Sequence, residues 1–313
     1  MSKHGSIITA ARDRTGNDPI FIWAGEAVRR KQAGDDVVNA TIGALTRDDG
    51  VLYTLPTVLE TLRRFQTHET AGYAPISGLP AFRNAVIHDL FGDGPLASRA
   101  VAVTTPGGSG AVYQAVVNFL EPGQAMLLPE FFWGPYRAIT DHGGRSLDPF
   151  PMFASDGSFT LEGLAEGLDR HLAEQGRALV VLNFPCHNPT GYTLTGEEWS
   201  RVCEIVEDAG SKGPVAVLID AAYMEFGGAS ARAWVDFVPR LMEHATVMVA
   251  WTASKSMAQY GARIGAIVGL HQDPAEVEQM DNAFGFTCRA TWSNSNHCLL
   301  YTSDAADESS RGG

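Results

Sequence analysis

Residues 215–220 read Val-Ala-Val-Leu-Ile-Asp, a continuous apolar run that ends in a carboxylate. A run of this length without polar alternation is typical of a strand buried on both faces, as in a parallel sheet. Four more short apolar runs have the same character, and they occupy residues 101–104, 125–128, 178–184 and 247–250. Together the five runs predict a mostly parallel sheet.

Amphipathic stretches lie between these runs and predict helices. They cover residues 110–120, 161–175 and 196–209, and the last follows Thr195, with Glu198 placed as in a capping box. Alternating strands and helices predict an α/β fold in which helices sandwich the sheet. Ligands of such sheets bind at the carboxyl ends of the strands, so the polar residues that follow a strand are the candidate site residues.

Composition excludes several classes of protein. The chain has 313 residues, of which 45% are hydrophobic and 19% charged, so it is long enough for a buried core and disorder is not expected. A formal net charge of -13 argues against nucleic acid or an anionic membrane as a partner.

The cysteines and the chain start bear on the compartment. Cys186, Cys203, Cys288 and Cys298 form no CxxC pair and have no spacing typical of disulfides, so we expect free thiols and no metal site. The start lacks an apolar signal region, and no apolar run has the length of a membrane span. These features predict a cytoplasmic protein.

Lys255 is the candidate nucleophile. It follows the run 247–250, within the segment Thr-Ala-Ser-Lys-Ser of residues 252–256. Partial desolvation there lowers the pKa of a lysine and prepares it to form a Schiff base. Arg263 can hold a phosphate by a bidentate contact, assisted by the hydroxyls of Thr252 and Ser254. Taken alone, the lysine could also be a solvated loop residue and the arginine a surface ion-pair partner.

Two other strand ends carry polar groups suited to a pyridine ring. Asp220 can pair with a protonated ring nitrogen, and the Tyr223 hydroxyl can reach a phenolic oxygen on the same ring. Asn188 opens an Asn-Pro-Thr-Gly turn after the run 178–184, and the turn aims its side chain. By themselves, these residues could be a helix cap and an ordinary loop.

A glycine-rich segment, Gly107-Gly108-Ser109-Gly110, separates the run 101–104 from a predicted helix. Glycines there let backbone N–H groups approach an anion at the helix N-terminus, and the Ser109 hydroxyl adds a donor. The spacing is that of neither a Walker loop nor a dinucleotide fingerprint. A turn without a ligand is the alternative.

Taken in order, these segments resemble the class I/II aminotransferases, the fold-type I enzymes that use pyridoxal phosphate and include the aspartate and aromatic aminotransferases. The order is a glycine-rich loop, Asn-Pro-Thr-Gly, Asp-x-x-Tyr, and Ser-Lys followed by Arg. The resemblance covers residues 38–297. It implies an N-terminal segment with part of a small domain over residues 1–49 and a large cofactor-binding domain over residues 50–297.

The resemblance implies a role for each matched residue. Lys255 would hold pyridoxal phosphate as a Schiff base and shuttle the proton, with Asp220 as the partner of the pyridinium nitrogen. Asn188 and Tyr223 would bind the phenolic oxygen. Trp133 would stack on the ring, with a core tryptophan as the alternative. The phosphate would be held by Gly108, Ser109, Gly110, Thr252, Ser254 and Arg263.

Further matches concern the subunit partner and the substrate. Tyr73 matches a family tyrosine that reaches the phosphate of the neighbouring subunit, which implies a homodimer. Gly43 and Asn188 match residues beside the substrate. Arg289 matches the arginine that crosses the dimer to bind a distal carboxylate, and an arginine on a helix surface is the alternative.

The implied reaction is transamination between a dicarboxylic or aromatic amino acid and a 2-oxo acid such as 2-oxoglutarate. The same cofactor apparatus also serves β-lyases and decarboxylases of this fold, so these reactions stay open. A non-catalytic regulator is disfavoured because the residues that precede the fold contain no basic helix pair. An inactive fragment of an enzyme is a further alternative.

The last residues differ in character from the rest. Residues 298–313 are similar to the translation of a transposase adaptor used in DNA sequencing libraries, so we expect this tail to be non-native; a polar native tail is the alternative. The second substrate arginine of the family, which grips the α-carboxylate, has no match in the chain. The chain is therefore expected to be nearly inactive toward aspartate, glutamate and aromatic amino acids.

Overall fold

The computed structural model describes residues 6–12, 14, 18–41, 43–63 and 71–297. It divides the chain into two compact units, Met1–Tyr53 and Thr54–Gly313. The predicted non-native tail, residues 298–313, lies outside the described residues. The assignment of the first unit to a small domain stays a prediction.

The first unit contains two helices, α1 (Thr9–Arg12) and α2 (Pro19–Gln32), among its described residues. Asp18 caps α2, because its Oδ1 accepts a hydrogen bond from the Ile20 amide at 2.8 Å, and Pro19 occupies the first turn. An isolated antiparallel bridge joins Thr46 to Leu52. These local signals define the elements of a unit with few buried side chains.

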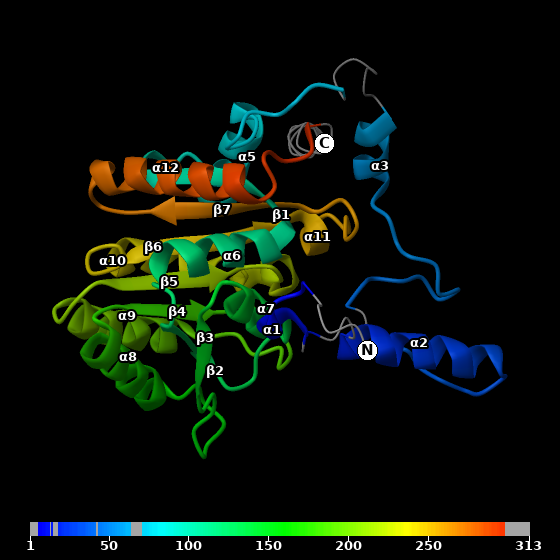
Figure 1. The fold of residues 1–313 in the computed structure, drawn as a ribbon, viewed down its shortest axis with the longest axis horizontal. Coiled ribbons are helices and arrows are strands. Elements are labelled where there is room, and N and C mark those ends of the chain that lie inside the picture. The colour runs from blue at the N-terminus through cyan, green and yellow to red at the C-terminus, as the bar shows by residue number, and fades with distance from the viewer. Residues whose placement is uncertain (1–5, 13, 15–17, 42, 64–70, 298–313) are drawn as a thin grey trace. The chain divides into compact units, whose positions relative to one another are not determined.

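The second unit contains the larger part of the fold (Figure 1). Its helices are α3 (Pro56–Arg63), α5 (Pro80–Phe91), α6 (Gly107–Phe119), α7 (Pro135–His142), α8 (Leu161–Gln175), α9 (Gly196–Gly210), α10 (Val238–Leu241), α11 (Ala253–Ser256) and α12 (Pro274–Thr291). Its strands are β1 (Ala100–Pro106), β2 (Ala125–Pro129), β3 (Ser146–Phe150), β4 (Ala178–Leu182), β5 (Val215–Asp220), β6 (Thr246–Thr252) and β7 (Ile264–Leu270). Short 3-10 turns occupy Ala97–Arg99, Met224–Phe226, Gly228–Ser230 and Ala233–Phe237.

Within the described residues, seven strands form one sheet in the order β1-β7-β6-β5-β4-β2-β3. The pairs from β6 to β3 are parallel, whereas β7 runs antiparallel to both β1 and β6. β1 therefore points in the same direction as β6. The predicted α/β fold with a mostly parallel sheet is confirmed.

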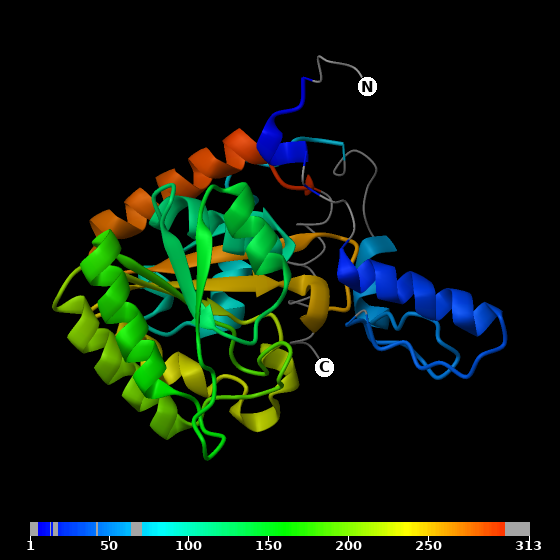
Figure 2. The same ribbon diagram turned by 60° about the horizontal axis from the view of Figure 1, so that its bottom comes forward.

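Side chains of the strands alternate between the two faces of the sheet and form two cores. One core packs against α5, α8, α9 and α10, and the other against α6, α7 and α12, so helices lie on both sides of the sheet (Figure 2). In β5, Val217 and Ile219 enter the first core, while Ala216 and Leu218 enter the second. Burial on both faces explains why the central strands are continuous apolar runs.

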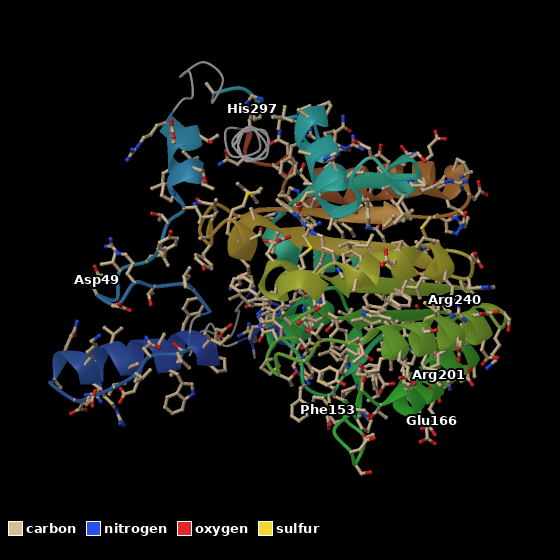
Figure 3. All side chains as sticks on the ribbon, turned by 180° about the vertical axis from the view of Figure 1, so that it is seen from behind. Asp49, Phe153, Glu166, Arg201, Arg240 and His297 are labelled. Atoms are coloured by element: carbon tan, nitrogen blue, oxygen red, sulfur yellow. The ribbon has the colours of Figure 1, made fainter. Side chains whose placement is uncertain are left out.

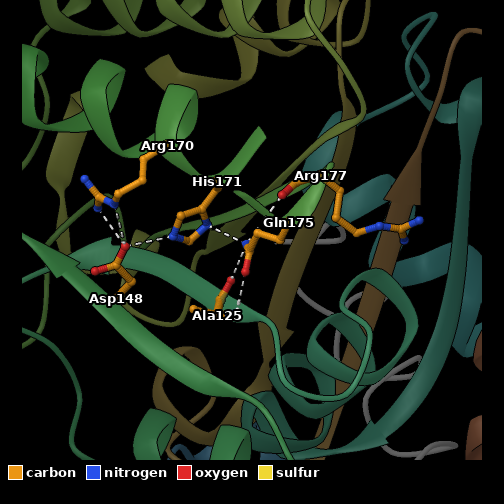
Figure 4. A network of polar contacts seen from close by, with 6 residues as sticks. All are labelled: Ala125, Asp148, Arg170, His171, Gln175 and Arg177. Carbon is orange, nitrogen blue, oxygen red and sulfur yellow. Dashed lines mark hydrogen bonds and ion pairs between the residues drawn. The ribbon is translucent and has the colours of Figure 1, made fainter. Parts of the chain in front are cut away.

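Polar side chains of α8 hold the edge strand β3 (Figure 4). Asp148 of β3 accepts a hydrogen bond from Arg170 Nη2 at 2.6 Å and lies 2.9 Å from His171 Nε2. Gln175 lies 2.9 Å from His171 Nδ1 and donates to the Ala125 carbonyl of β2 at 3.1 Å. The edge strand is thus fixed by a polar network, in contrast to the apolar central strands.

The outer faces of α8 and α9 are charged. Glu166 and Arg201 are exposed there and point outward in Figure 3. The predicted capping box at the start of α9 is confirmed: Thr195 Oγ1 accepts from the Glu198 amide at 3.1 Å, and Glu198 Oε2 accepts from the Thr195 amide at 2.7 Å. α9 begins where this reciprocal pair satisfies its free amides.

The structure differs from the prediction both in the bounds of elements and in the elements present. The helix predicted over residues 110–120 begins at Gly107, so the glycine-rich segment is its first turn and not a loop before it. The strand predicted over residues 178–184 ends at Leu182, and the next residue, Asn183, uses its side chain in tertiary hydrogen bonds. β3 and β7 were not predicted, since the first is mixed in polarity and the second contains two glycines.

Candidate functional site

The predicted site residues meet at one edge of the sheet. β1, β4, β5 and β6 end at this edge and β7 begins there, because β7 is antiparallel to its neighbours. Asp220 is the last residue of β5, while Lys255 and Arg263 follow β6 and precede β7. The edge is the position at which parallel sheets bind ligands.

Lys255 lies in the four-residue helix α11, directly after β6. Its Nζ is 5.2 Å from the centre of the Tyr223 ring and 5.1 Å from that of the Tyr260 ring. Burial lowers the pKa of Lys255, and the positive charge of Arg263 lowers it further. A larger fraction of neutral amine follows, as a nucleophile or a base requires.

Asp220 is buried at the end of β5, with 5% of its surface exposed. Its Oδ2 accepts a hydrogen bond from the Tyr136 hydroxyl at 2.6 Å, and its Oδ1 accepts from the Ala222 amide at 3.2 Å. Desolvation raises the pKa of Asp220, and the hydrogen bonds from Tyr136 and Ala222 oppose that rise. The carboxylate is therefore poised for a cationic ligand that would stabilise its charge.

Asn188 and Tyr223 come from different strand ends and meet at the same place. The distance from Asn188 Nδ2 to the Tyr223 hydroxyl is 3.5 Å. Burial raises the pKa of Tyr223, with additional effects of Asp220 and Tyr260, so its hydroxyl stays protonated. The two side chains can therefore donate to one oxygen of a ligand.

Donors and a cation gather at the start of α6. The residue at its N-cap, Pro106, gives no side-chain cap, so first-turn amides that include those of Gly108 and Ser109 can bind an anion. The Arg263 guanidinium reaches the same turn, since Nη2 donates to the Pro106 carbonyl at 3.3 Å and Nη1 donates to Ser254 Oγ at 3.3 Å. This arrangement fits a phosphate.

The backbone at this end of the site depends on unusual dihedral angles. Gly107 has a φ of 70° and Arg263 a φ of 56°, both in the left-handed region. A Cβ on Gly107 would lie 2.3 Å from Arg263 Nη2, so a side chain there would displace the guanidinium. Strained backbone of this kind gathers at functional sites.

Thr252 has a structural role at the start of α11. Its hydroxyl donates to the Ile264 carbonyl at 3.3 Å and accepts from the Ser254 amide at 3.1 Å. Because a hydroxyl has one hydrogen, Thr252 caps α11 and joins β6 to β7 in this arrangement. Its contact with a phosphate stays a prediction.

Three residues at the site were missed by sequence reasoning. Tyr136 donates to Asp220, Asn183 Nδ2 donates to the Asp220 carbonyl at 2.9 Å, and the ring of Tyr260 lies beside Lys255. Tyr136 lies three residues after Trp133, and their rings meet edge-on at 5.4 Å and 89°. That spacing is the only sequence signal for Tyr136, because its partner lies 84 residues away.

The described contacts do not test the predicted roles of three residues. Gly43 belongs to the first unit. Tyr73 is 92% exposed, and Arg289 is an exposed residue of α12 whose Nη1 donates to Ser293 Oγ at 2.7 Å. Their predicted roles, which involve a second subunit or the substrate, stay predictions.

The described residues contain neither a cluster that could bind a metal nor a helix that could span a membrane. They hold no group of three or more His, Cys, Asp or Glu side chains placed to bind a metal ion. None of their helices is both long and apolar enough to cross a membrane.

Known proteins similar to this chain are aminotransferases. An aromatic-amino-acid aminotransferase of Paracoccus denitrificans is 30% identical over 240 residues, which are 74% of this chain and 58% of that protein. A tyrosine aminotransferase of Klebsiella pneumoniae is 28% identical over 83% of this chain and 66% of its own length. The chain thus spans less than two thirds of either relative.

Solved structures agree on the fold. A crystal structure of an aminotransferase from Anaerococcus prevotii DSM 20548 matches with a TM-score of 0.87 and 30% identity, over 96% of this chain and 75% of that one. An aromatic-amino-acid aminotransferase from Burkholderia pseudomallei, covalently bound to pyridoxal phosphate, matches with a TM-score of 0.77 and 25% identity, over 94% of this chain and 73% of that one.

The family comparison covers most of the sequence. The model for aminotransferase class I and II matches residues 35–309, which include every motif discussed above and continue past His297 into the segment predicted to be non-native. The chain therefore belongs to the class I and II aminotransferase family.

Proposed function

We propose that this chain contributes the cofactor-binding part of a pyridoxal-phosphate-dependent aminotransferase, which moves an amino group between an amino acid and a 2-oxo acid. The observation that carries the proposal is the position of Lys255 at one edge of the sheet, between the Arg263 end and the Asp220 end of the site. Similarity to relatives named as aromatic-amino-acid and tyrosine aminotransferases supports it.

The side chains fit pyridoxal phosphate at both ends. One end offers the Arg263 cation, the Ser254 hydroxyl and the first-turn amides of α6, which suit a dianionic phosphate. The opposite end offers the buried Asp220 carboxylate, which suits a protonated ring nitrogen. Asn188 and Tyr223 can donate to the phenolic oxygen between them.

Lys255, Asp220 and Trp133 have different roles in the proposed reaction. Pyridoxal phosphate, when bound, supplies a conjugated ring that delocalises the electron pair left when the substrate loses its Cα proton. Lys255 Nζ takes that proton and returns it, because its lowered pKa leaves a neutral amine available. Asp220 would keep the ring nitrogen protonated, and Trp133 would cover one face of the ring.

Substrate, assembly and compartment complete the proposal. Dicarboxylic or aromatic amino acids are the proposed donors, with Gly43 and Arg289 on the substrate side. We propose a homodimer in which Tyr73, 92% exposed in a single chain, reaches the partner subunit. Light scattering of the purified protein measures the oligomeric state. Free thiols at Cys186, Cys203 and Cys288 support a reducing, cytoplasmic compartment.

Cofactor capture tests the proposal directly. The purified chain with added pyridoxal phosphate should gain an absorbance band in the visible region, and the Lys255→Ala variant should lack it. Lys212→Ala is the matched control, because Lys212 is exposed and paired with Asp169 and Asp208 far from the edge of the sheet. Borohydride reduction followed by peptide mapping should place the label on Lys255.

The reaction type needs a second measurement. Excess amino acid is added to the loaded protein and followed over hours, so that even a slow single turnover is detected. Stoichiometric 2-oxo acid supports transamination, whereas release of ammonia or carbon dioxide supports a β-lyase or a decarboxylase. A label on any residue other than Lys255 would overturn the site assignment itself.

A further inference from the structure

A buried tyrosine stands behind the candidate ring-nitrogen partner. Tyr136 of α7 is 1% exposed, and its hydroxyl donates to Asp220 Oδ2 at 2.6 Å. Asp220 is itself 5% exposed, so water contributes little to stabilising its charge. A hydrogen bond to an ionised group inside a protein is stronger than a neutral one, which makes this contact a major determinant of the state of Asp220.

Asp220 is fixed at three of its atoms by three different groups. Asn183 Nδ2 donates to its main-chain carbonyl at 2.9 Å, the Ala222 amide donates to Oδ1 at 3.2 Å, and Tyr136 donates to Oδ2. A carboxylate accepts about four hydrogen bonds, so these donors leave room for a further N–H. The carboxylate is oriented but not saturated.

The chemical type of this donor matters. A lysine or arginine at position 136 would form an ion pair with Asp220 and compete with a cationic ring nitrogen. A tyrosine stabilises the negative charge and adds none of its own. Burial and the adjacent Asp220 raise the pKa of Tyr136 well above its usual value. The hydroxyl therefore stays protonated, and remains a hydrogen-bond donor, at neutral pH.

On the basis of the proposed function, we propose that Tyr136 is a positioning residue whose hydroxyl keeps Asp220 ionised and directed toward the ring nitrogen of the bound cofactor. Trp133 lies just before α7; its carbonyl accepts from the Tyr136 amide at 3.0 Å, and its ring packs edge-on against that of Tyr136. The segment that leads into α7 and the first turn of this helix thus bring together the proposed stacking aromatic and the donor to the proposed partner of the ring nitrogen.

Tyrosines are the titratable neighbours of Asp220 whose interaction with it is described. Two titratable groups that interact with Asp220 are Tyr136 from α7 and Tyr223 from the segment after β5. Both are tyrosines that stay protonated near neutral pH. Removal of the Tyr136 hydroxyl therefore changes the hydrogen bonding of Asp220 without changing the charge around it.

The test compares the full chains of wild type, Tyr136→Phe and Tyr192→Phe. Tyr192 is the matched control, because its hydroxyl donates to the Glu198 carboxylate at the same 2.6 Å on a different helix. Aspartate labelled with ¹³C at the carboxyl carbon reports the titration of Asp220, assigned with Asp220→Asn, first without and then with pyridoxal phosphate. Absorbance titration with pyridoxal phosphate gives its Kd.

In Tyr136→Phe the midpoint of the Asp220 titration should rise by about 1 to 2 pH units, the effect of losing one charge-assisted hydrogen bond. In Tyr192→Phe it should stay in place. The Kd for pyridoxal phosphate should change by less than about tenfold, since the phosphate donors are intact. An Asp220 midpoint unchanged in a folded Tyr136→Phe variant, or shifted equally in both variants, would overturn the proposal.

A second substitution covers the case in which Tyr136→Phe fails to fold. A fluorinated tyrosine at position 136 keeps the shape and makes the hydroxyl a stronger donor, so the Asp220 midpoint should fall, opposite to the effect of phenylalanine. A purely structural role for Tyr136 predicts no such fall. The cofactor-free titration is independent of catalysis, so an inactive protein with the expected midpoints would count against the proposed function alone.

Discussion

Tyr136 and Tyr192 each donate to a buried carboxylate at 2.6 Å, yet the two carboxylates differ in the direction of their pKa shift. The pKa of Glu198, the partner of Tyr192, is lowered, and that of Asp220, the partner of Tyr136, is raised. The tyrosine contact lowers the pKa of both carboxylates, so it does not by itself set the direction of the net shift. The depth of burial and the number of further donors account for the difference.

Glu198 has its donors in place within the protein. Desolvation alone would raise the pKa of Glu198, but hydrogen bonds from Tyr192, from the Thr195 amide at 2.7 Å and from the Phe159 amide at 3.0 Å outweigh it. The side chain also lies in the first turn of α9, where the helix dipole favours a negative charge. Glu198 is thus a structural carboxylate.

Asp220 has fewer donors and deeper burial. Only Tyr136 and the Ala222 amide donate to its side chain among the described contacts, and desolvation exceeds their effect on its pKa. A group in this state gains most from a cationic ligand. The comparison suggests that, of two buried acids, the one with incomplete hydrogen bonding is the functional one.

The largest effect that separates the two acids should be kinetic. Asp220→Asn should slow the single-turnover reaction of the loaded protein with an amino acid by at least about 100-fold, because a preorganised charge opposite the ring nitrogen is lost. Capture of pyridoxal phosphate should weaken much less, since Arg263 and the start of α6 hold the phosphate. Stopped-flow absorbance measures both quantities.

Glu198→Gln is the control for that experiment, as an equally conservative change at the other acid. Its single-turnover rate should remain within about twofold of wild type, because a side chain hydrogen-bonded only within the fold makes no transition-state interaction. Equal losses in the two variants would remove the distinction between a functional and a structural carboxylate.

An intermediate effect should appear in stability. Glu198→Gln should lower the free energy of unfolding at pH 7 by about 1 to 3 kcal/mol, because the amide N–H₂ replaces an acceptor that faces buried donors. The folded pKa of Glu198 is lowered, so its contribution is present above the unfolded pKa of about 4.3 and is lost as the pH falls through the folded value. Urea unfolding of variant and wild type at pH 7 and at pH 3 measures the difference.

Glu197→Gln, at an adjacent exposed position of α9, is the matched control and should change stability by less than about 0.5 kcal/mol. A loss from Glu198→Gln that persists in full at pH 3 would show that packing, and not the ionised carboxylate, provides the stability.

The sequence predicted elements whose pattern is local. β5 and α8 were predicted with the observed bounds, since a doubly buried strand and an amphipathic helix each show their period directly. β7 was missed because Gly265 and Gly269 interrupt its apolar run. A Cβ on Gly265 would come within 2.7 Å of Gly107, and a Cβ on Gly269 would come within 2.7 Å of Met280. Close packing therefore requires glycine at both positions, and these glycines break the apolar pattern that would have predicted the strand.

The site residues also fall into two groups, those that local motifs predicted and those that were missed. Lys255, Asp220, Asn188 and Arg263 stand in motifs beside strand ends, and those motifs predicted their convergence. Tyr136 and Asn183 lie 84 and 37 residues from Asp220, and no local pattern links them to it. Contacts between distant elements depend on the register of the sheet and on how α7 packs against it, which a single sequence does not specify.

The smallest effect concerns the cofactor-free protein and has the opposite sign for the two acids. The folded pKa of Asp220 is raised, so its favourable contribution is present below the unfolded pKa of about 3.9 and is lost as the pH rises through the folded value. At neutral pH the buried charge therefore destabilises the cofactor-free fold. Asp220→Asn should raise the free energy of unfolding by about 0.5 to 2 kcal/mol, the usual range for relieving such a site.

This gain in stability should shrink toward acid pH. It should turn into a loss once pyridoxal phosphate is bound, because the variant has no anion for the ring nitrogen. Urea titrations at pH 8 and at acid pH, without and with pyridoxal phosphate, measure these changes. If the cofactor-free Asp220→Asn variant were destabilised at pH 8, as we expect for Glu198→Gln at pH 7, both acids would be structural and the contrast between the two tyrosine pairs would fail.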